Sequence, residues 1–417
     1  MELKRVVVTG LGALTPIGNT VPEYWDSLSK GVSGAAPITR FDASKFKTRF
    51  ACEVKNFSAE NFMDRKEARK LDPFVHYALA STEEAVKDAA LDFENLDVNR
   101  IGVIWGSGIG GLKTFLDEVT NYAGGDGTPR FNPFFIPKMI LDIAPGHISM
   151  KYGLRGPNFS TVSACASSTN ALIDSLMYIR CGYADVILTG GSEAIINEAG
   201  IGGFNAMHAL STRNDDPATA SRPFDKDRDG FVAGEGSGTI VVESLDHALA
   251  RGAKIYAELV GGGMSADAHH ITASHPEGLG ARLAMTNAMR DANITTDDID
   301  YINVHGTSTP VGDISETKAI MDLFGEHAFE LNISSTKSMT GHLLGAAGVA
   351  ESIACILAIQ NGIVPPTINH FTDDPNLDPR LNFTFNTAQK KDLRFAQSNT
   401  FGFGGHNASV IFKKYEE

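Results

Sequence analysis

Short runs of apolar and β-branched residues alternate along the chain with longer stretches of helical spacing. Strands that are apolar on both faces are typical of an α/β protein whose sheet is buried between helices. The clearest expected helix is Pro73–Leu91, where apolar side chains follow one face and charged side chains the other. Between Ser211 and Gly238 the pattern predicts a long turn-rich loop, and loops of that length tend to be functional or flexible. The expected strands are Arg5–Thr9, Ile101–Trp105, Val186–Thr189, Thr239–Glu243, Tyr256–Val260, Tyr301–Val304 and Leu381–Asn386.

Two distant segments, Ser163–Gly182 and Ser338–Gly362, share one pattern. Each opens with small residues, continues as an apolar helix with almost no charge, and closes on glycine. A helix with so little polar surface is expected to be buried by close neighbours. The repeat favours a chain of two similar halves. We place the boundary where the strand pattern restarts, which gives an N-terminal half of residues 1–255 and a C-terminal half of residues 256–417.

The composition is that of a compact folded protein. Of 417 residues, 42% are hydrophobic and 21% are charged, which excludes the disordered, collagen-like and coiled-coil classes. The net charge of −14 repels nucleic acids and anionic membranes, so we expect neither as a partner. The four cysteines form no C-x-x-C pair, which argues against a zinc ribbon and fits a reducing compartment. The N-terminus lacks a signal-peptide pattern and no long uncharged apolar stretch follows, so we expect a cytoplasmic protein.

Two local motifs begin like cofactor sites but lack the rest of the pattern. Gly106, Gly108 and Gly111 satisfy G-x-G-x-x-G after a strand, yet turn-rich sequence follows in place of a second strand with its acidic residue. DKDRDG begins like a calcium loop, but Gly236 stands where the bidentate glutamate is required. We therefore expect no nucleotide cofactor and no metal, and we expect the Asp residues of DKDRDG to bond local backbone.

The candidate chemistry centres on Cys165, which opens the first apolar helix. Exposed amides at a helix N-terminus favour the thiolate, the nucleophilic form, although a cysteine among small residues is often an inert core residue. Two histidines are available as partners. His305 follows the expected strand Tyr301–Val304, and His342 precedes the second apolar helix, approximately where Cys165 stands before the first. If the halves pack with pseudo-symmetry, all three meet at the interface as a nucleophile with two bases.

Two further features accompany this set. Lys337 lies among hydroxyl residues in the loop of His342, where it is either a solvated surface lysine or an electrostatic organiser. Phe401 and Phe403 lie between glycines in SNTFGFGGHNAS, which permit close backbone approach and motion. An amide there fits an oxyanion donor and an aromatic ring fits a gate, while a plain hydrophobic turn is the alternative.

Four motifs, in this order and spacing, resemble those of the elongating β-ketoacyl-[acyl-carrier-protein] synthases, most of all the synthase II group of bacterial fatty-acid synthesis. They are TVSACASS, NVHGTSTPVGD, STKSMTGHLLGAAG and NTFGFGGHNAS, and the resemblance covers almost the whole chain. It implies a thiolase-like fold of two duplicated α/β halves in a five-layer αβαβα arrangement, usually a homodimer, with no cofactor. It also implies an acyltransferase of fatty-acid synthesis. Such an enzyme joins malonyl-acyl-carrier protein (malonyl-ACP) to an enzyme-bound acyl chain, taken from acyl-ACP, by decarboxylative Claisen condensation.

The resemblance also implies a role for each site residue. Cys165 takes the acyl chain as a thioester, and His305 and His342 stabilise the enolate that forms as malonyl-ACP loses CO₂. Lys337 holds the His342 loop in register. The amides of Cys165 and Phe403 form the oxyanion hole, with Phe403 as the gate. The remaining matched positions are Ile109 in the acyl pocket, Thr272 and Thr307 on the pantetheine arm, and Lys66, Arg69, Lys70, Arg130 and His208 at the carrier-docking surface.

Three positions depart from the family's pattern. His208 stands in place of a common docking arginine, His406 in place of threonine, and Val304 in place of alanine before the catalytic histidine. They bear on carrier preference and the shape of the gate. One alternative is a polyketide-type ketosynthase or its chain-length partner, and that partner normally lacks the cysteine. Another is a coenzyme-A thiolase, in which the resemblance implies a Cys-His-Cys set of catalytic residues. The last is a non-catalytic binding homologue.

Overall fold

The computed structural model describes residues 3–416, and its main feature is one continuous sheet. The strand order is β10-β9-β13-β14-β8-β1-β7-β6-β4-β5. Two further pairs of short strands lie outside it, β2 (Ala36–Pro37) with β3 (Phe50–Ala51) and β11 (Ile363–Val364) with β12 (Gln389–Lys390). The strands of the sheet are β1 (Val6–Leu14), β4 (Ile101–Gly106), β5 (Asn158–Thr161), β6 (Val186–Glu193), β7 (Gly236–Ser244), β8 (Ala257–Ala266), β9 (Tyr301–Asn303), β10 (Asn332–Ser334), β13 (Phe395–Gly402) and β14 (His406–Lys413).

The sheet repeats a single topology. Counted along the chain, the strands of residues 6–244 lie in the order third, second, fourth, fifth, first, and those of residues 257–413 lie in the same order. In both sections the second strand pairs parallel with its two neighbours, and the other pairs are antiparallel. A short antiparallel pairing, Val7 with Glu258 and Val8 with Ala257, joins β1 to β8. The duplicated sequence pattern therefore corresponds to a duplicated sheet.

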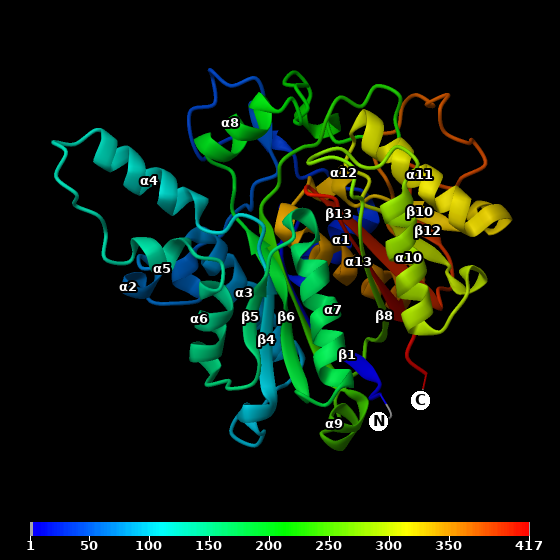
Figure 1. Cartoon of the computed structure of the whole chain (residues 1–417), viewed down its shortest axis with the longest axis horizontal. Helices are drawn as coiled ribbons and strands as arrows, with labels where there is room; N and C mark the ends of the chain where they lie inside the picture. Colours follow the sequence, from blue (N-terminus) through cyan, green and yellow to red (C-terminus); the bar gives the residue numbers. More distant parts are fainter. Residues whose placement is uncertain (1–2, 417) are drawn as a thin grey trace.

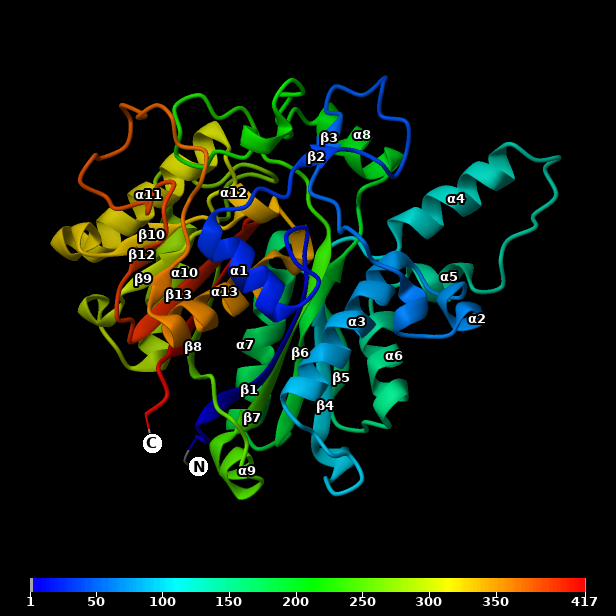
Figure 2. The same ribbon diagram turned by 180° about the vertical axis from the view of Figure 1, so that it is seen from behind.

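Helices cover the outer face of each section and fill the space between them (Figure 1; Figure 2). α3 packs on β1, β6 and β7, with α6 beside it, and α10 packs on β8 and β14, with α11 beside it. α7 and α13 contact each other and strands of both sections. This is the expected five-layer αβαβα arrangement. The helices are α1 (Val21–Lys30), α2 (Arg65–Ala68), α3 (Pro73–Asp88), α4 (Leu112–Ala123), α5 (Phe135–Met139), α6 (Ile143–Tyr152), α7 (Ser167–Arg180), α8 (Glu198–Ala206), α9 (Leu245–Ala250), α10 (Leu279–Ala292), α11 (Pro310–Phe324), α12 (Lys337–Thr340) and α13 (Ala347–Asn361).

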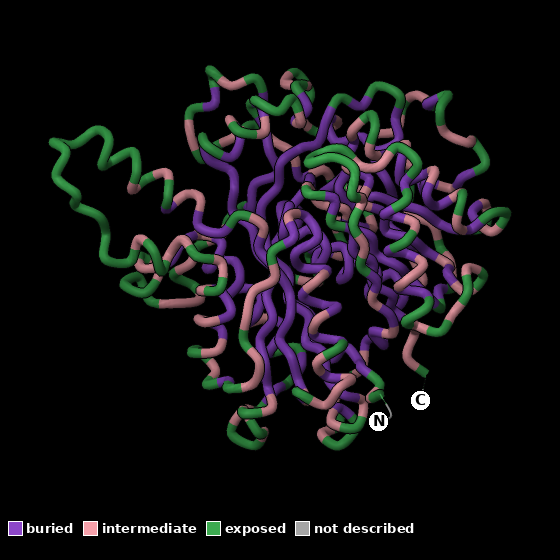
Figure 3. The backbone as a smooth tube through the Cα atoms, in the orientation of Figure 1, coloured by how far each residue is buried: buried purple, intermediate pink, exposed green. Residues whose placement is uncertain are grey.

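The two central helices are the two apolar segments of the sequence. Leu172 and Leu176 of α7 and Ile353 and Ile356 of α13 are fully buried in one core cluster. The centre of the molecule is mostly buried, as the purple tube in Figure 3 shows. Burial of each such side chain contributes roughly 1.5–3 kcal/mol. Within residues 3–416, Leu344–Asn361 is the one helical stretch whose length and composition would suit a membrane span, and it is mostly buried inside the protein. Its apolar surface is therefore used by the core.

One expected strand is wrong. Leu381–Asn386 is not a strand, because Thr384 and Asn386 have positive φ values of 51° and 58°, which interrupt an extended backbone. Isolated bridges are all that this segment contributes to sheet pairing. β5, β10, β13 and β14 are strands that the sequence pattern did not predict.

Candidate active site

Cys165 lies in a short 3-10 turn directly before the central helix α7. The residue before it, Ala164, has a φ of 52°, and Leu344 begins a matching turn before α13 with a φ of 48°. Left-handed backbone at a non-glycine residue costs about 1–3 kcal/mol and tends to occur at functional sites. In the structural repeat, Gly345 is therefore the residue equivalent to Cys165. His342 lies slightly earlier in its loop than the sequence repeat suggested.

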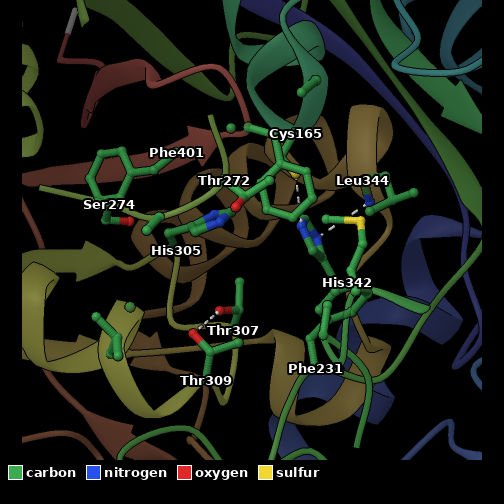
Figure 4. A pocket seen from close by; sticks show the side chains of 18 of the residues that line it. Cys165, Phe231, Thr272, Ser274, His305, Thr307, Thr309, His342, Leu344 and Phe401 are labelled. Atoms are coloured by element: carbon green, nitrogen blue, oxygen red, sulfur yellow. Dashed lines mark hydrogen bonds between the residues drawn. The ribbon is translucent and has the colours of Figure 1, made fainter. Parts of the chain in front are cut away.

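His342 directs a ring nitrogen at the sulfur of Cys165. Its Nε2 atom lies 3.0 Å from Sγ, and the backbone N–H of Leu344 donates to its Nδ1 atom at 3.3 Å (Figure 4). Because Nδ1 accepts a hydrogen bond, the neutral ring carries its proton on Nε2. Burial, and next the charge of Lys337, lower the pKa of His342 well below its ordinary value. The side chain is therefore a neutral donor that faces the reacting centre.

His305 completes a group of three side chains. Its ring centroid lies 5.3 Å from that of His342, at 86° to it, and donor atoms of Cys165, His305 and His342 all lie within 4.8 Å of one another. Burial lowers the pKa of His305 well below its ordinary value, and the charge of Lys337 adds to this. The side chains that the sequence analysis singled out on separate segments therefore meet, with both imidazoles neutral.

A buried carboxylate fixes the backbone of His305. The two oxygens of Glu316, on α11, accept hydrogen bonds from the amides of His305 and Gly306, each at 2.8 Å. Burial raises the pKa of Glu316 to about 7, although these amides act against the shift. Glu316 is a positioning residue that the sequence analysis missed.

The donor set does not fit a resident metal. A cysteine with two histidines is a set that zinc accepts in other proteins. However, a metal-bound histidine donates its second ring N–H to an acceptor, whereas Nδ1 of His342 faces the N–H donor of Leu344. The arrangement instead suits a nucleophile beside two hydrogen-bond donors.

Cys165 is a neutral thiol in the resting site. Burial raises its pKa to about 12, while the charge of Lys337 and the backbone amide of Phe403 act in the opposite direction. The helix N-terminus favours the thiolate, as the sequence analysis expected, and desolvation by burial opposes it. The Phe403 amide approaches because Gly402 has no side chain: a Cβ there would lie 3.1 Å from the Cys165 nitrogen.

Lys337 is buried and paired, so the surface interpretation of this residue is wrong. Only 1% of Lys337 is exposed, and its ammonium forms an ion pair and hydrogen bond with the buried carboxylate of Glu351 on α13. Burial raises the pKa of Glu351 to about 7, and Lys337 opposes that shift. Lys337 does not line the cavity. It acts on the site through its charge, which lowers the pKa of both catalytic histidine candidates.

The glycine-rich loop after β4 binds a protein carboxylate. Glu193, the last residue of β6, accepts hydrogen bonds from the amides of Gly108 at 2.8 Å, Ile109 at 3.1 Å and Gly345 at 3.0 Å. It thereby ties this loop to the turn before α13. Glu193 already binds the amides that a nucleotide pyrophosphate would use. The G-x-G-x-x-G match therefore does not indicate a dinucleotide-binding site here.

The DKDRDG segment is a structured turn, as expected. Asp225 accepts hydrogen bonds from the amides of Asp227 at 2.9 Å, Phe371 at 2.6 Å and Thr372 at 2.8 Å. Its carboxylate connects two loops, and the segment does not adopt the geometry of a calcium-binding loop.

A cavity of about 520 Å³ opens above the three central side chains. Phe401 packs on His305 with ring centroids 5.6 Å apart, and Phe231 packs on His342 at 5.4 Å. The hydroxyls of Thr307 and Thr309 hydrogen bond to each other at 3.0 Å. An apolar interior with a few polar groups suits an acyl chain on a polar arm. The sequence-selected residues in its lining are Ile109, Cys165, His208, Thr272, His305, Thr307, His342, Phe401 and Phe403.

The other predicted docking residues lie outside the cavity lining. Lys66 and Arg69 are exposed on or just after α2. Lys70 pairs with Glu67 at 2.7 Å, and Arg130, in the exposed connection between α4 and α5, lies 3.6 Å from Asp126. Two of these four cations are therefore partly balanced by neighbouring carboxylates.

Both parts of the chain match family models. The "Beta-ketoacyl synthase, N-terminal domain" matches residues 3–248, and the "Beta-ketoacyl synthase, C-terminal domain" matches residues 256–371. The chain belongs to the β-ketoacyl synthase family. This confirms the resemblance and the thiolase-like fold class that the sequence indicated.

Similar members of this β-ketoacyl synthase family include curated enzymes and solved structures. The 3-oxoacyl-[acyl-carrier-protein] synthase 2 of Synechocystis sp. is 50% identical over 416 residues, 100% of this chain and 99% of the relative. The protein of the same name from Staphylococcus aureus strain N315 is 52% identical over 414 residues, 99% of each chain. The structure of the ishigamide ketosynthase/chain length factor is 36% identical with a TM-score of 0.92, covering 99% of this chain and 100% of the other.

Proposed function

We propose that this β-ketoacyl synthase elongates acyl chains on acyl carrier protein by two carbons, through decarboxylative condensation with malonyl-ACP. The observation that carries the proposal is a cysteine sulfur at 3.0 Å from a neutral, inward-facing imidazole, at the floor of an apolar cavity. The identity of 50–52% to proteins named 3-oxoacyl-[acyl-carrier-protein] synthase 2 supports fatty-acid elongation over a polyketide role.

The first step is acyl transfer to Cys165. The thiol attacks the thioester carbonyl of acyl-ACP, a carbon–sulfur bond forms, and the carrier leaves as its thiol with the proton that Cys165 gave up. The amides of Cys165 and Phe403 stabilise the negative oxygen of the tetrahedral intermediate. Burial raises the pKa of Cys165 and favours the thiol, so we infer that its proton is lost as the carbon–sulfur bond forms.

The second step is decarboxylation of malonyl-ACP. Loss of CO₂ leaves an electron pair that becomes an enolate, with negative charge on the thioester oxygen. The Nε2–H of His342 and the ring of His305 donate to that oxygen, and neutral imidazoles with lowered pKa values do so without first carrying a positive charge. The enolate carbon then attacks the acyl thioester, the bond from that carbonyl to the Cys165 sulfur breaks, and Cys165 leaves as a thiolate that takes up a proton from water.

The remaining residues position the substrates. Thr272 and Thr307 line the cavity where the pantetheine arm enters, and Ile109 lines the acyl pocket. Lys337 is a positioning residue that holds the His342 loop through Glu351. We assign carrier docking to the surface that includes Lys66, Arg69, Lys70, Arg130 and His208.

We also propose that each chain consists of two halves, residues 1–255 and 256–417, and that two such chains form a cytoplasmic homodimer. The α4–α5 arm projects from the body (Figure 1) and exposes 41–46% of Phe115, Tyr122, Phe131 and Phe134. Strand β5 lies at the edge of the sheet, and within residues 3–416 β4 is its one neighbour in the strand order. Exposed aromatic clusters and free strand edges are usually covered by a partner. Sedimentation should give a mass of twice the 44.6 kDa chain.

Product analysis tests the activity. The protein is incubated with malonyl-ACP and a series of acyl-ACP primers, and products are identified by mass spectrometry. We expect 3-oxoacyl-ACP two carbons longer than each accepted primer. Transfer of primers without any elongation would refute the proposed reaction.

A further inference from the structure

One buried carboxylate connects two walls of the active-site cavity. Glu193 ends β6 and is fully buried. Its Oε2 atom accepts hydrogen bonds from the amides of Gly108 at 2.8 Å and Gly345 at 3.0 Å. Ile109 follows Gly108 and Leu344 precedes Gly345, and both of these apolar residues line the cavity. A single side chain therefore holds two wall residues that come from distant segments of the chain.

The loop that carries Ile109 presents three successive amides to this carboxylate. Besides Gly108, the amides of Ile109 and Gly110 donate to Oε1 of Glu193, at 3.1 and 3.2 Å. The hydroxyl of Ser107 donates to the same oxygen at 3.2 Å. Successive amides that converge in this way form a concave anion site. Here the anion is a side chain of the protein itself, so the backbone on both sides of Ile109 is fixed from within.

The five donors suit an ionised carboxylate. A carboxylate only accepts hydrogen bonds, whereas a protonated carboxyl group would direct its own O–H at one of the donors. Burial raises the pKa of Glu193, and the backbone amides oppose the rise. Glutamine keeps the size of the side chain but has an NH₂ group in place of one accepting oxygen. Glu193→Gln should therefore release some of these donors without opening a cavity.

The two backbones approach the carboxylate very closely. A Cβ atom at Gly345 would lie 2.3 Å from the nitrogen of Gly108 and 2.6 Å from Oε2 of Glu193. A Cβ atom at Gly108 would lie 2.9 Å from the same oxygen. Glycine is thus required at both positions. At the other end of the loop, the Gly111 amide donates to the Met139 carbonyl at 3.0 Å, so the Ile109 loop is held at both ends.

We propose that Glu193 is a positioning residue that limits the length of acyl chain the cavity accepts. The proposal rests on the proposed function, which supplies the acyl chain as the ligand. By holding residues 107–110, Glu193 keeps the side chain of Ile109 at a fixed place in the cavity wall. A fixed wall rejects a chain that is too long, because its extra methylene groups find no space. A wall on a loosened loop moves aside for them, so loss of the carboxylate extends the accepted range toward longer chains.

The test compares two saturated acyl-ACP primers, one that the parent protein elongates well and one long enough that the parent elongates it poorly. The value of kcat/KM is measured for each, and the ratio of long to short is the readout. We expect Glu193→Gln to raise this ratio roughly tenfold, the lower end of the discrimination that one methylene group gives in an apolar pocket. A purely structural role would reduce both values together and leave the ratio unchanged.

Two further variants show whether the effect passes through Ile109. Ile109→Ala removes the side chain that is being positioned, so Glu193→Gln should change the ratio much less in that background. Glu84→Gln is the matched control, because Glu84 also accepts from two backbone amides but lies outside the cavity lining. It should leave the ratio unchanged.

Glu193→Asp keeps the proposal testable if Glu193→Gln does not fold. It retains the charge on a side chain one methylene group shorter, which cannot reach both walls, and should also raise the ratio. In either folded variant, hydrogen exchange of the amides in residues 107–110 should be faster than in the parent, because these amides lose their acceptor.

The outcomes separate this proposal from the proposed function. An unchanged ratio in a folded Glu193 variant, an equal rise in the Ile109→Ala background, or the same rise in Glu84→Gln would overturn the positioning role and leave the enzyme intact. Failure of the parent protein to elongate even the short primer would instead refute the function itself.

Discussion

His342 presents its Nε2 atom to Sγ of Cys165 at 3.0 Å, while a backbone amide of the same loop occupies Nδ1. The tautomer is therefore set by the loop that carries the ring. The proton faces the place where negative charge develops during condensation, and burial keeps the ring neutral. This relationship leads to a division of labour between the two steps of the reaction.

Replacement of His342 should separate acylation from decarboxylation. We expect His342→Ala to reduce decarboxylation of malonyl-ACP by about 10²–10³-fold, since one enolate donor is lost, and to affect acylation of Cys165 much less. Release of CO₂ and the mass of the acylated protein measure the two steps. His342→Gln retains an amide donor and should lose less. Equal losses in both steps would contradict the assignment.

Removal of the Lys337 ammonium should destabilise the fold. Lys337→Met leaves Glu351 buried without its cation, and we expect a loss of about 3–5 kcal/mol in the free energy of unfolding. Chemical denaturation measures it. The double variant Lys337→Met with Glu351→Gln removes both charges and should recover most of the loss. A single variant as stable as the parent would show that the pair is not needed for folding.

The acyl pocket should become shorter when Ile109 is enlarged. Ile109 lines the cavity, and Ile109→Phe adds volume at its wall. We expect kcat/KM to fall by about tenfold or more for long primers and little for short ones, a discrimination of at least 1.4 kcal/mol. Ile140→Phe, outside the lining, is the control. A uniform decrease for every primer would exclude this role.

Stability near neutral pH should depend on Glu84. Its oxygens accept from the amides of Ala13 and Val21, each at 2.8 Å, and burial raises its pKa from 4.5 to about 7. The folded state therefore keeps a proton that the unfolded chain releases, so Glu84 makes stability decrease as the pH rises from about 4.5 to about 7.

Comparison with Glu84→Gln isolates this effect from other titrating groups. Relative to the variant, the wild type should lose up to about 3 kcal/mol between about pH 5 and pH 8. Urea denaturation at both pH values gives the difference. A stability difference that is constant with pH would mean that Glu84 ionises as readily in the folded protein as in the unfolded chain.

The sequence predicted the elements of the fold that can be recognised because they contain very few charged residues. α7 and α13 were recognisable because a helix with so few charges has to be buried, and the repeat of that pattern indicated two halves. β13 and β14 were missed because buried polar residues, such as Gln397 of β13 and Ser409 of β14, dilute their apolar pattern. Thr384 and Asn386 resemble strand residues locally, but their positive φ values arise from loop contacts that a local pattern does not contain.

The sequence predicted the site residues that lie in motifs, and it missed the carboxylates that hold those motifs in place. Cys165, His305 and His342 lie on recognisable segments. Glu193 acts on an amide 85 positions away in sequence, and Glu316 acts on amides 10 and 11 positions away but across a turn, on a different element. Glu351 had a usable signal, because it is the one charged residue of α13. The neutral state of Cys165 was not predictable from its helix position, since it depends on burial by segments from both halves.

The most direct test of the account is intact-mass analysis of the protein after incubation with acyl-ACP alone. We predict a mass increase of one acyl group, located on Cys165 by peptide mapping, and neither the adduct nor condensation in Cys165→Ser, whose hydroxyl has no base strong enough to activate it. Folded protein that forms no adduct, or a Cys165→Ser variant that condenses normally, would contradict the claim that this sulfur carries the growing chain.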